Sequence, residues 1–177
     1  MNYMRTYTGK KIDPLNININ QIDINDICHA LSFLCRGNGH LKEFYTVACH
    51  SIHCCYEAKS RGYSKKIQLI CLLHDASEAY LSDIIRPIKP RLKNYYEIEE
   101  KVQTLIYKKY LNDLITKEEL DIMKQIDDDI LDVELGIFLN DEYIKESKLN
   151  ITINNNSINF NEVKKEFLNL FESLINN

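Results

Sequence analysis

A chain of 177 residues, of which 45% are hydrophobic and 27% charged, can bury a core of its own, so a disordered chain is excluded and we expect one domain over residues 1–177. The formal net charge of −4 gives no electrostatic basis for nucleic-acid binding. The start MNYMRTYTGKK lacks the apolar core of a signal peptide, and no later run reaches the roughly 18 apolar residues that span a bilayer, so we expect a cytoplasmic protein without a membrane partner.

Three helices are predicted in the first half of the chain. Asp23 or Asn25 can cap the first, which runs through DICHALSFLCR until the glycines of GNGH allow a turn. A second helix is expected over residues 43–59. The third, over residues 65–81, is apolar on nearly every side, so it is expected to be the most buried.

A basic loop separates these helices from the next two. Pro87 and Pro90 exclude a regular helix from SDIIRPIKP, so this segment is expected to be extended or turned. A charged amphipathic helix should follow over residues 94–111. Thr116 and Glu119 have the spacing of a capping box, which predicts a further helix that runs to about residue 140.

The end of the chain is expected to close the bundle. Asn161 can cap a last amphipathic helix, whose apolar stripe includes Val163, Phe167 and Phe171. Residues 150–159 are rich in Asn and β-branched side chains, which favours a short strand or hairpin formed with the N-terminal segment MRTYTG. The predicted fold is therefore all-α, a helical bundle with room for one short β-hairpin.

Six cysteines occur without a CxxC pair and lie in helix-like segments, so most are expected to be buried thiols rather than members of a disulfide scaffold. A rival interpretation is a zinc site on one helix, drawn from Cys49, His50, His53 and Cys54. These four side chains point over a wide arc of a helix, so such a site would need further ligands from elsewhere.

His74 and Asp75 are the most informative residues of the chain. They lie in the apolar stretch IQLICLLHDASEAYL, where an unpaired ionised carboxylate would be very unfavourable. Adjacent His and Asp are good ligands of divalent metals. A metal centre is therefore the simplest partner for both side chains.

Two further ligands can be chosen by helical phase. His50 falls on the same stripe as Val47 and Cys54 in the second predicted helix. In the acidic run of the fifth, Asp127 falls in line with core-facing positions, whereas Asp129 lies on the solvent side. Each residue alone is more often an ordinary core or surface side chain.

Taken in order, His50, then His74 and Asp75, then Asp127 form the H…HD…D pattern of the HD-domain phosphohydrolases, which this chain resembles. The resemblance extends through the segments DICHALSFLCRGNGHLKEFYTVACHS, LLHDASEAYLSDIIRPIKP and QIDDDILDVELGIFL, and so over most of residues 3–140. The start RTYTGKKIDPLN is similar to members of this group that resemble 5′-deoxynucleotidases and phage deoxynucleoside triphosphate triphosphohydrolases.

The resemblance implies that these four residues hold a divalent metal ion. Two imidazoles and two carboxylates suit Co²⁺, Mn²⁺, Zn²⁺, Fe²⁺ or Mg²⁺, and the residue types do not select among them. A bound cation would lower the pKa of a coordinated water and polarise a phosphate oxygen.

The resemblance also assigns Glu78 and Asp83 to catalytic or substrate-contacting positions. Glu78 lies four residues after His74, so a continuous helix would place both on one face. The alternatives are a surface charge for Glu78 and a turn cap for Asp83.

Phosphate binding requires positive charge. Arg36 matches the arginine that resembles a phosphate clamp in this family, and Lys89 matches a P-x-K element. Arg86 is close enough in sequence to reach the same anion. His29 matches a recurrent family position, which the resemblance implies to contact either the phosphate or the metal-ligating side chains. Gly37 replaces an aromatic residue that many relatives carry next to the base, which leaves base selectivity open.

The leading interpretation is a metal-dependent hydrolase of deoxynucleotides, a small-molecule substrate, and the resemblance implies a homo-oligomer. The basic RPIKPR loop favours a triphosphohydrolase that releases deoxynucleoside and triphosphate. The alternatives are a 5′-deoxynucleotidase that releases orthophosphate and a non-catalytic nucleotide- or metal-binding module.

Overall fold

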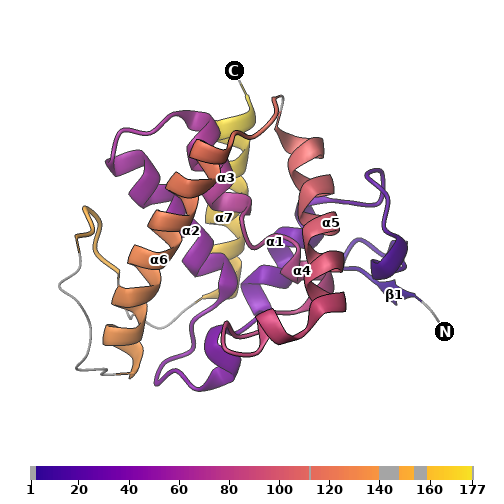
Figure 1. Ribbon diagram of the computed structural model, residues 1–177, viewed down its shortest axis with the longest axis horizontal. Coiled ribbons are helices and arrows are strands. Elements are labelled where there is room, and N and C mark those ends of the chain that lie inside the picture. The colour runs from indigo at the N-terminus through magenta and orange to yellow at the C-terminus, as the bar shows by residue number, and fades with distance from the viewer. Residues whose placement is uncertain (1–2, 112, 140–147, 154–158, 177) are drawn as a thin grey trace.

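The computed structural model describes residues 3–111, 113–139, 148–153 and 159–176, and these are mainly helical (Figure 1). This confirms the all-α fold class. The α-helices are α1 (Ile24–Phe33), α2 (Val47–Ser60), α3 (Lys65–Leu73), α4 (Glu78–Leu81), α5 (Lys93–Tyr110), α6 (Lys117–Leu139) and α7 (Phe160–Ile175). Short 3-10 helices are formed by η1 (Pro14–Asn16), η2 (Arg36–Gly39) and η3 (Lys89–Arg91).

The centre of the fold is a packed group of helices, α1, α2, α3 and α7. Helix α6 lies across α2 and α3, whereas α5 contacts α3 from the other side (Figure 1). The core includes Leu72, Leu73, Ile130 and Phe167, whose side chains are fully buried. None of the described helices is long and apolar enough to cross a membrane.

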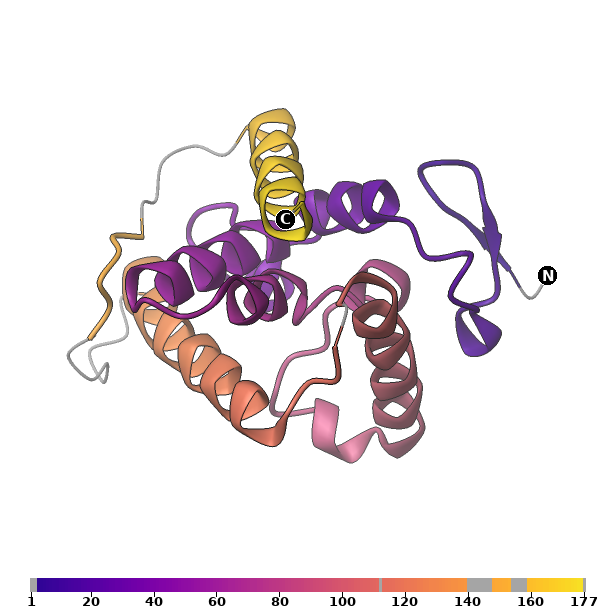
Figure 2. The same ribbon diagram turned by 90° about the horizontal axis from the view of Figure 1, so that it is seen from above.

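A two-stranded antiparallel sheet lies near the N-terminus, on the opposite side of the molecule from α6 (Figure 2). Strand β1 (Met4–Arg5) pairs with β2 (Lys11–Ile12). The expected N-terminal hairpin is therefore present, but it closes on its own segment. Residues 150–153 form no strand, and residues 154–158 lie outside the described part of the chain, so the prediction that the 150–159 segment contributes to the hairpin is wrong for residues 150–153.

A buried glutamate, rather than a paired strand, holds the backbone of residues 150 and 151. Glu57 of α2 is fully buried and accepts hydrogen bonds from the backbone N–H groups of Asn150 and Ile151, at 3.0–3.1 Å. Arg61 balances its charge through a 2.7 Å ion pair and also reaches Asp129 of α6 at 2.8 Å. A side chain rather than a neighbouring strand thus satisfies these backbone donors.

Helices α1, α2 and α6 each begin directly after a residue whose side chain caps the helix. Asp23, one of the two residues predicted to cap the first helix, caps α1 by accepting a hydrogen bond from the N–H of Asn25. Helix α2 begins four residues later than expected, because Thr46 caps it by accepting from Cys49 N–H. The reciprocal bonds of Thr116 and Glu119 confirm the capping box that begins α6.

The last helix has its cap two residues earlier than predicted. The side chain of Asn159, not Asn161, accepts from the backbone at the start of α7. The predicted apolar stripe is confirmed, since Val163, Phe167 and Phe171 are buried against the body.

The prediction of one continuous buried helix over residues 65–81 is wrong, because the helix is interrupted at residues 74–77. Helix α3 ends at Leu73, residues 74–77 form turns, and α4 begins at Glu78. Successive residues of a helix point about 100° apart, so a continuous helix would aim His74 and Asp75 in different directions. The turns bring both side chains toward one point.

Gln103 of α5 stabilises this break. Its side chain donates to the Leu73 carbonyl at 2.7 Å and accepts from the Ser77 N–H at 3.0 Å. One amide therefore satisfies a backbone acceptor and a backbone donor that lie on the two sides of the interruption.

Replacing Gln103 by Ala should lower the free energy of unfolding by about 1–3 kcal/mol, because two partly buried backbone groups lose their partner. Urea unfolding followed by circular dichroism measures this change. Gln125→Ala is the matched control, since Gln125 makes an exposed bond to Asp129 and should cost much less. Equal costs for both variants would contradict the role given to Gln103.

All six cysteines are free thiols, and five of them are buried. Burial raises the pKa of Cys28 and Cys55 to about 12, and it raises the pKa of Cys71 further still. Cys35 is only half-buried. The expectation that most cysteines are buried thiols is confirmed.

In the native protein, a thiol reagent such as DTNB should therefore modify Cys35 first, and the five buried thiols only after unfolding in guanidinium. Stopped-flow absorbance resolves the fast phase, and Cys35→Ser should remove it. A fast phase that persists in this variant would show that another cysteine is exposed.

Candidate metal centre

The four residues predicted as metal ligands meet at one point. His50 comes from α2, His74 and Asp75 from the turn after α3, and Asp127 from α6. His50 Nε2 lies 3.2 Å from His74 Nε2 and 3.0 Å from Asp127 Oδ1. Asp75 Oδ2 lies 3.3 Å from His74 Nε2. The helices that carry these residues lie side by side in Figure 1.

The other nitrogen of each imidazole is held by an acceptor. His50 Nδ1 lies 2.7 Å from Glu134 Oε1, and His74 Nδ1 lies 2.7 Å from the Cys71 carbonyl oxygen. A carboxylate and a carbonyl only accept, so both Nδ1 atoms carry a proton. In the neutral rings, the lone pairs of both Nε2 atoms then face the same point.

This donor set fits a divalent cation. Two imidazole nitrogens and two carboxylates converge there, and both kinds of side chain are ligands of divalent cations. Donor atoms about 2.1 Å from one ion, at angles near 90–110°, lie roughly 3.0–3.4 Å apart. The closest separations between the ligand atoms, 3.0, 3.2 and 3.3 Å, fall in this range.

The charges of the cluster favour the ionised form of its side chains, because they raise the pKa of His74 and lower the pKa of Asp75. Burial lowers the pKa of His74, but the nearby Asp75 and Asp127 outweigh burial and raise it well above its usual range. Burial raises the pKa of Asp75, yet the charge of His74 holds it well below its usual range. The carboxylates are therefore ionised and available to a cation.

A cysteine that the predicted ligand set omits also faces the cluster. Cys54 Sγ lies 3.6 Å from His50 Nε2, and the ligand atoms of His50, Cys54 and His74 all lie within 4.8 Å of one another. Of the rival zinc set, only His50 and Cys54 belong to this cluster. Cys49 Sγ accepts a hydrogen bond from the Thr46 hydroxyl, and His53 Nδ1 lies 2.5 Å from the Tyr45 hydroxyl. The four-residue spacing from His50 was the signal for Cys54 in the sequence.

Arg36 lies at the edge of the cluster. Its Nε lies 3.3 Å from Glu134 Oε2, and its Nη1 lies 3.4 Å from Asp75 Oδ2. Burial opposes the charge, but Glu134 and Asp75 raise the pKa of Arg36, so the guanidinium stays charged. Glu134, which was not predicted as a site residue, thus links the arginine to a candidate ligand, His50.

Glu78 is the buried acid of the site. Its side chain is 4% exposed, Oε2 has no hydrogen-bond partner among the described residues, and Oε1 lies 3.8 Å from Lys89 Nζ. Burial, together with the charges of Asp75 and Asp83, raises its pKa well above the usual range. Lys89 also pairs with Glu99 at 2.8 Å.

Charged residues of the site, including Arg36 and Asp75, influence the pKa of Asp83. Burial raises the pKa of this half-buried carboxyl group, and the nearby Arg36 opposes that rise. The position is compatible with the role that the resemblance implies for Asp83, although the contacts assign it no separate task.

Two other predicted substrate-binding residues have protein partners. Arg86 is 52% exposed and pairs with Asp127 Oδ2 at 2.5 Å and Asp128 Oδ1 at 2.6 Å. His29 stacks on Tyr7, with ring centres 3.9 Å apart, and also contacts Phe33. The described contacts of His29 are thus with aromatic rings and not with the cluster.

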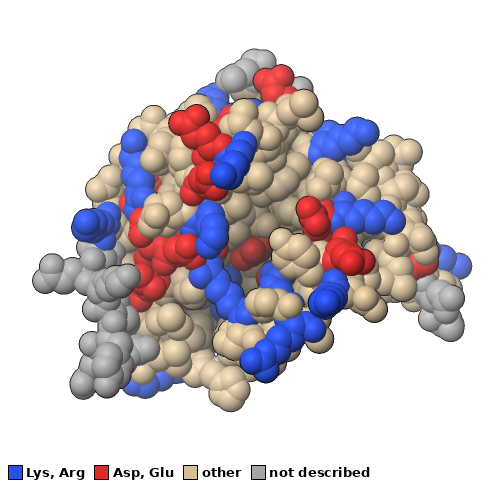
Figure 3. Space-filling model, viewed as in Figure 1, with Lys and Arg blue, Asp and Glu red and all other residues tan. Residues whose placement is uncertain are grey.

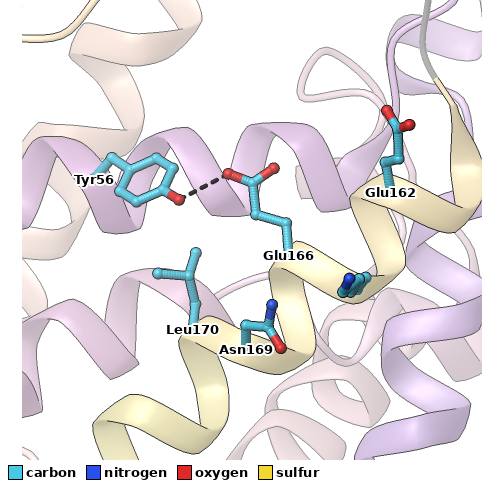
Figure 4. Close-up of a pocket in the computed structure, with 6 residues that line it drawn as sticks. Tyr56, Glu162, Glu166, Asn169 and Leu170 are labelled. Atoms are coloured by element: carbon cyan, nitrogen blue, oxygen red, sulfur yellow. Dashed lines mark hydrogen bonds between the residues drawn. The ribbon is translucent and has the colours of Figure 1, made fainter.

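Depressions of different character are found on the surface of the described residues. Figure 3 shows a hollow near the centre of one face, with acidic atoms inside it and Lys and Arg side chains around it. A separate open depression of about 290 Å³ lies between α2 and α7, where Tyr56 donates a 2.7 Å hydrogen bond to Glu166 (Figure 4). None of the residues that line the second depression belongs to the metal-ligand cluster.

Two curated proteins are similar to this chain. YfdR of Escherichia coli K12 is 40% identical over 110 residues, which are 62% of this chain and 59% of that protein. A protein of Rhodobacter capsulatus is 31% identical over 113 residues, 61% of this chain and 58% of its own length. The chain thus spans less than two thirds of the length of these relatives, and both are described only as uncharacterized. No protein-family model matches the chain.

Glu134→Gln should weaken metal binding about 10- to 100-fold, because the neutral amide no longer polarises His50 or balances Arg36. Titration of the chelator-treated protein with Zn²⁺ against a chromogenic chelator measures the affinity. Asp132→Asn, an exposed change on the same helix, is the control and should leave the affinity unchanged. An unaltered affinity in Glu134→Gln would contradict this role of the glutamate.

Proposed function

We propose that this protein is a metal-dependent phosphohydrolase that acts on nucleotides. The observation that carries the proposal is the convergence of two imidazole nitrogens and two carboxylates on one point, beside a buried acid and a buried arginine. The order of these residues along the chain, the H…HD…D pattern of the HD-domain phosphohydrolases, supports the same reaction class.

His50, His74, Asp75 and Asp127 would hold the divalent cation. When bound, the cation supplies a coordinated water of lowered pKa and polarises a phosphate oxygen. The protein keeps both imidazoles oriented through Glu134 and the Cys71 carbonyl, so the site is organised before substrate arrives.

Glu78 is suited to proton transfer. Its raised pKa brings proton exchange closer to neutral pH than for an ordinary carboxyl group. Its Oε2 has no protein partner among the described residues, so this atom can give a proton to, or accept one from, a group in the site. We assign Glu78 the role of general acid or base.

Arg36 is suited to phosphate binding. Its guanidinium remains charged although its side chain is only 13% exposed, and Glu134 fixes its Nε. A guanidinium can bind two phosphate oxygens at once, and burial strengthens that interaction. Lys89, close to Glu78, is a second cation at the same edge.

The pairing of the loop cations favours deoxynucleoside monophosphates as a second candidate substrate beside the triphosphates. Arg86 pairs with Asp127 and Asp128, and Lys89 pairs with Glu99. Cations that already have carboxylate partners contribute less to the binding of β- and γ-phosphates. Glu78 Oε2 is buried and has no hydrogen-bond partner among the described residues, which a role in proton transfer explains better than a non-catalytic nucleotide-binding module does.

Metal-replete protein should hydrolyse members of a panel of deoxynucleoside mono- and triphosphates, and Asp127→Asn should lower the rate at least about 100-fold by removing a metal ligand. Mass spectrometry identifies the products. Nucleoside with triphosphate indicates a triphosphohydrolase, and nucleoside with orthophosphate indicates a 5′-nucleotidase.

The control is Asp121→Asn, an exposed change on the same helix that should retain full activity. Chelation of the metal should abolish turnover, and added metal should restore it. Nucleotide binding without any turnover, whichever divalent metal is supplied, would overturn the enzyme in favour of the binding module.

A further inference from the structure

The position of Cys54 differs from that of the other cysteines whose sulfur contacts are described. Cys28 Sγ donates to the Lys164 carbonyl at 3.1 Å, and Cys49 Sγ lies 3.2 Å from the Thr46 hydroxyl. Cys54 Sγ instead lies 3.6 Å from His50 Nε2, the nitrogen that faces the candidate metal centre. Cys54 is therefore directed at the donor cluster, whereas the other two sulfurs are occupied elsewhere.

The separation between these two atoms matches that of two donors on one ion. A nitrogen about 2.1 Å and a sulfur about 2.3 Å from the same ion lie roughly 3.6 Å apart at a tetrahedral angle. Cys54 and His50 are four residues apart on α2, so their side chains rise from one face of the helix. The same face of α2 thus offers both an imidazole and a thiol.

We propose that Cys54 is a ligand of the metal centre and that the site consequently takes a thiophilic divalent cation, such as Zn²⁺, Co²⁺ or Fe²⁺, in preference to Mg²⁺. The inference rests on the metal centre of the proposed function. Soft sulfur donors bind these ions well, whereas Mg²⁺ is bound through oxygen ligands and water.

Ligation replaces the thiol proton by the metal, and the proton passes to solvent. Burial raises the pKa of Cys54 in the absence of a cation, but a coordinating cation stabilises the thiolate directly. Cys54 is 1% exposed, so the protein shields its sulfur from bulk water. The cluster then combines a soft donor from α2 with hard carboxylate donors from the turn after α3 and from α6.

The experiment is a titration of the full-length, chelator-treated protein with Co²⁺, followed by absorption spectroscopy. Ligand-field bands in the visible report a bound cobalt ion, and a sulfur-to-cobalt charge-transfer band in the near ultraviolet reports a thiolate ligand. The wild-type protein should show both. Cys54→Ser should keep the visible bands and lose the charge-transfer band, and its affinity for Zn²⁺ should fall at least about 10-fold while its affinity for Mg²⁺ stays unchanged.

Cys55→Ser is the matched control, because Cys55 is the next residue, is equally buried and is not part of the cluster. It should retain both kinds of band. Circular dichroism confirms that each variant is folded, and the wild-type spectrum tests for a sulfur ligand without any variant. Visible bands without a charge-transfer band in the wild type, or a charge-transfer band that persists in Cys54→Ser, would overturn Cys54 as a ligand and leave the metal centre intact. The absence of any cobalt bands in the wild type would overturn the metal centre itself.

Discussion

The site depends on one constraint, the acceptor that holds Nδ1 of each histidine. Glu134 binds His50, and a main-chain carbonyl binds His74, so both rings must direct Nε2 inward. The arrangement brings two imidazole nitrogens and two carboxylates together around one point, which is a donor set that suits a divalent cation. Glu134 uses its second oxygen to hold Arg36, so the same carboxylate orients the donor cluster and the cation at its edge.

Much of the candidate site could be predicted from the sequence, because the residues that converge there stand out locally. His74 and Asp75 interrupt an apolar stretch, and helical phase alone separates Asp127 from Asp129. In the structure Asp127 lies 3.0 Å from His50, whereas Asp129 pairs with Arg61, so the two aspartates point in different directions. The capping box of α6 was equally local and equally predictable.

The remaining features depend on contacts between distant parts of the chain, which periodicity does not reveal. Nothing around residue 74 signals a break in a helix, because Gln103, which stabilises it, lies 26 residues after Ser77. The link between Glu134 and Arg36 likewise joins helices far apart in sequence. The strand predicted near residue 150 does not form. The distant Glu57 accepts hydrogen bonds from the backbone N–H groups of Asn150 and Ile151 instead.

The candidate ligands come from three segments of the chain, and His50 and Asp127 are 77 residues apart. An unfolded chain cannot hold them together without a large loss of conformational entropy. A cation bound by this cluster therefore binds the folded state alone, and it stabilises the fold in proportion to the logarithm of its concentration. The metal would then act as a cross-link between α2, the turn after α3 and α6, and the stability of the protein would depend on the metal supply around it.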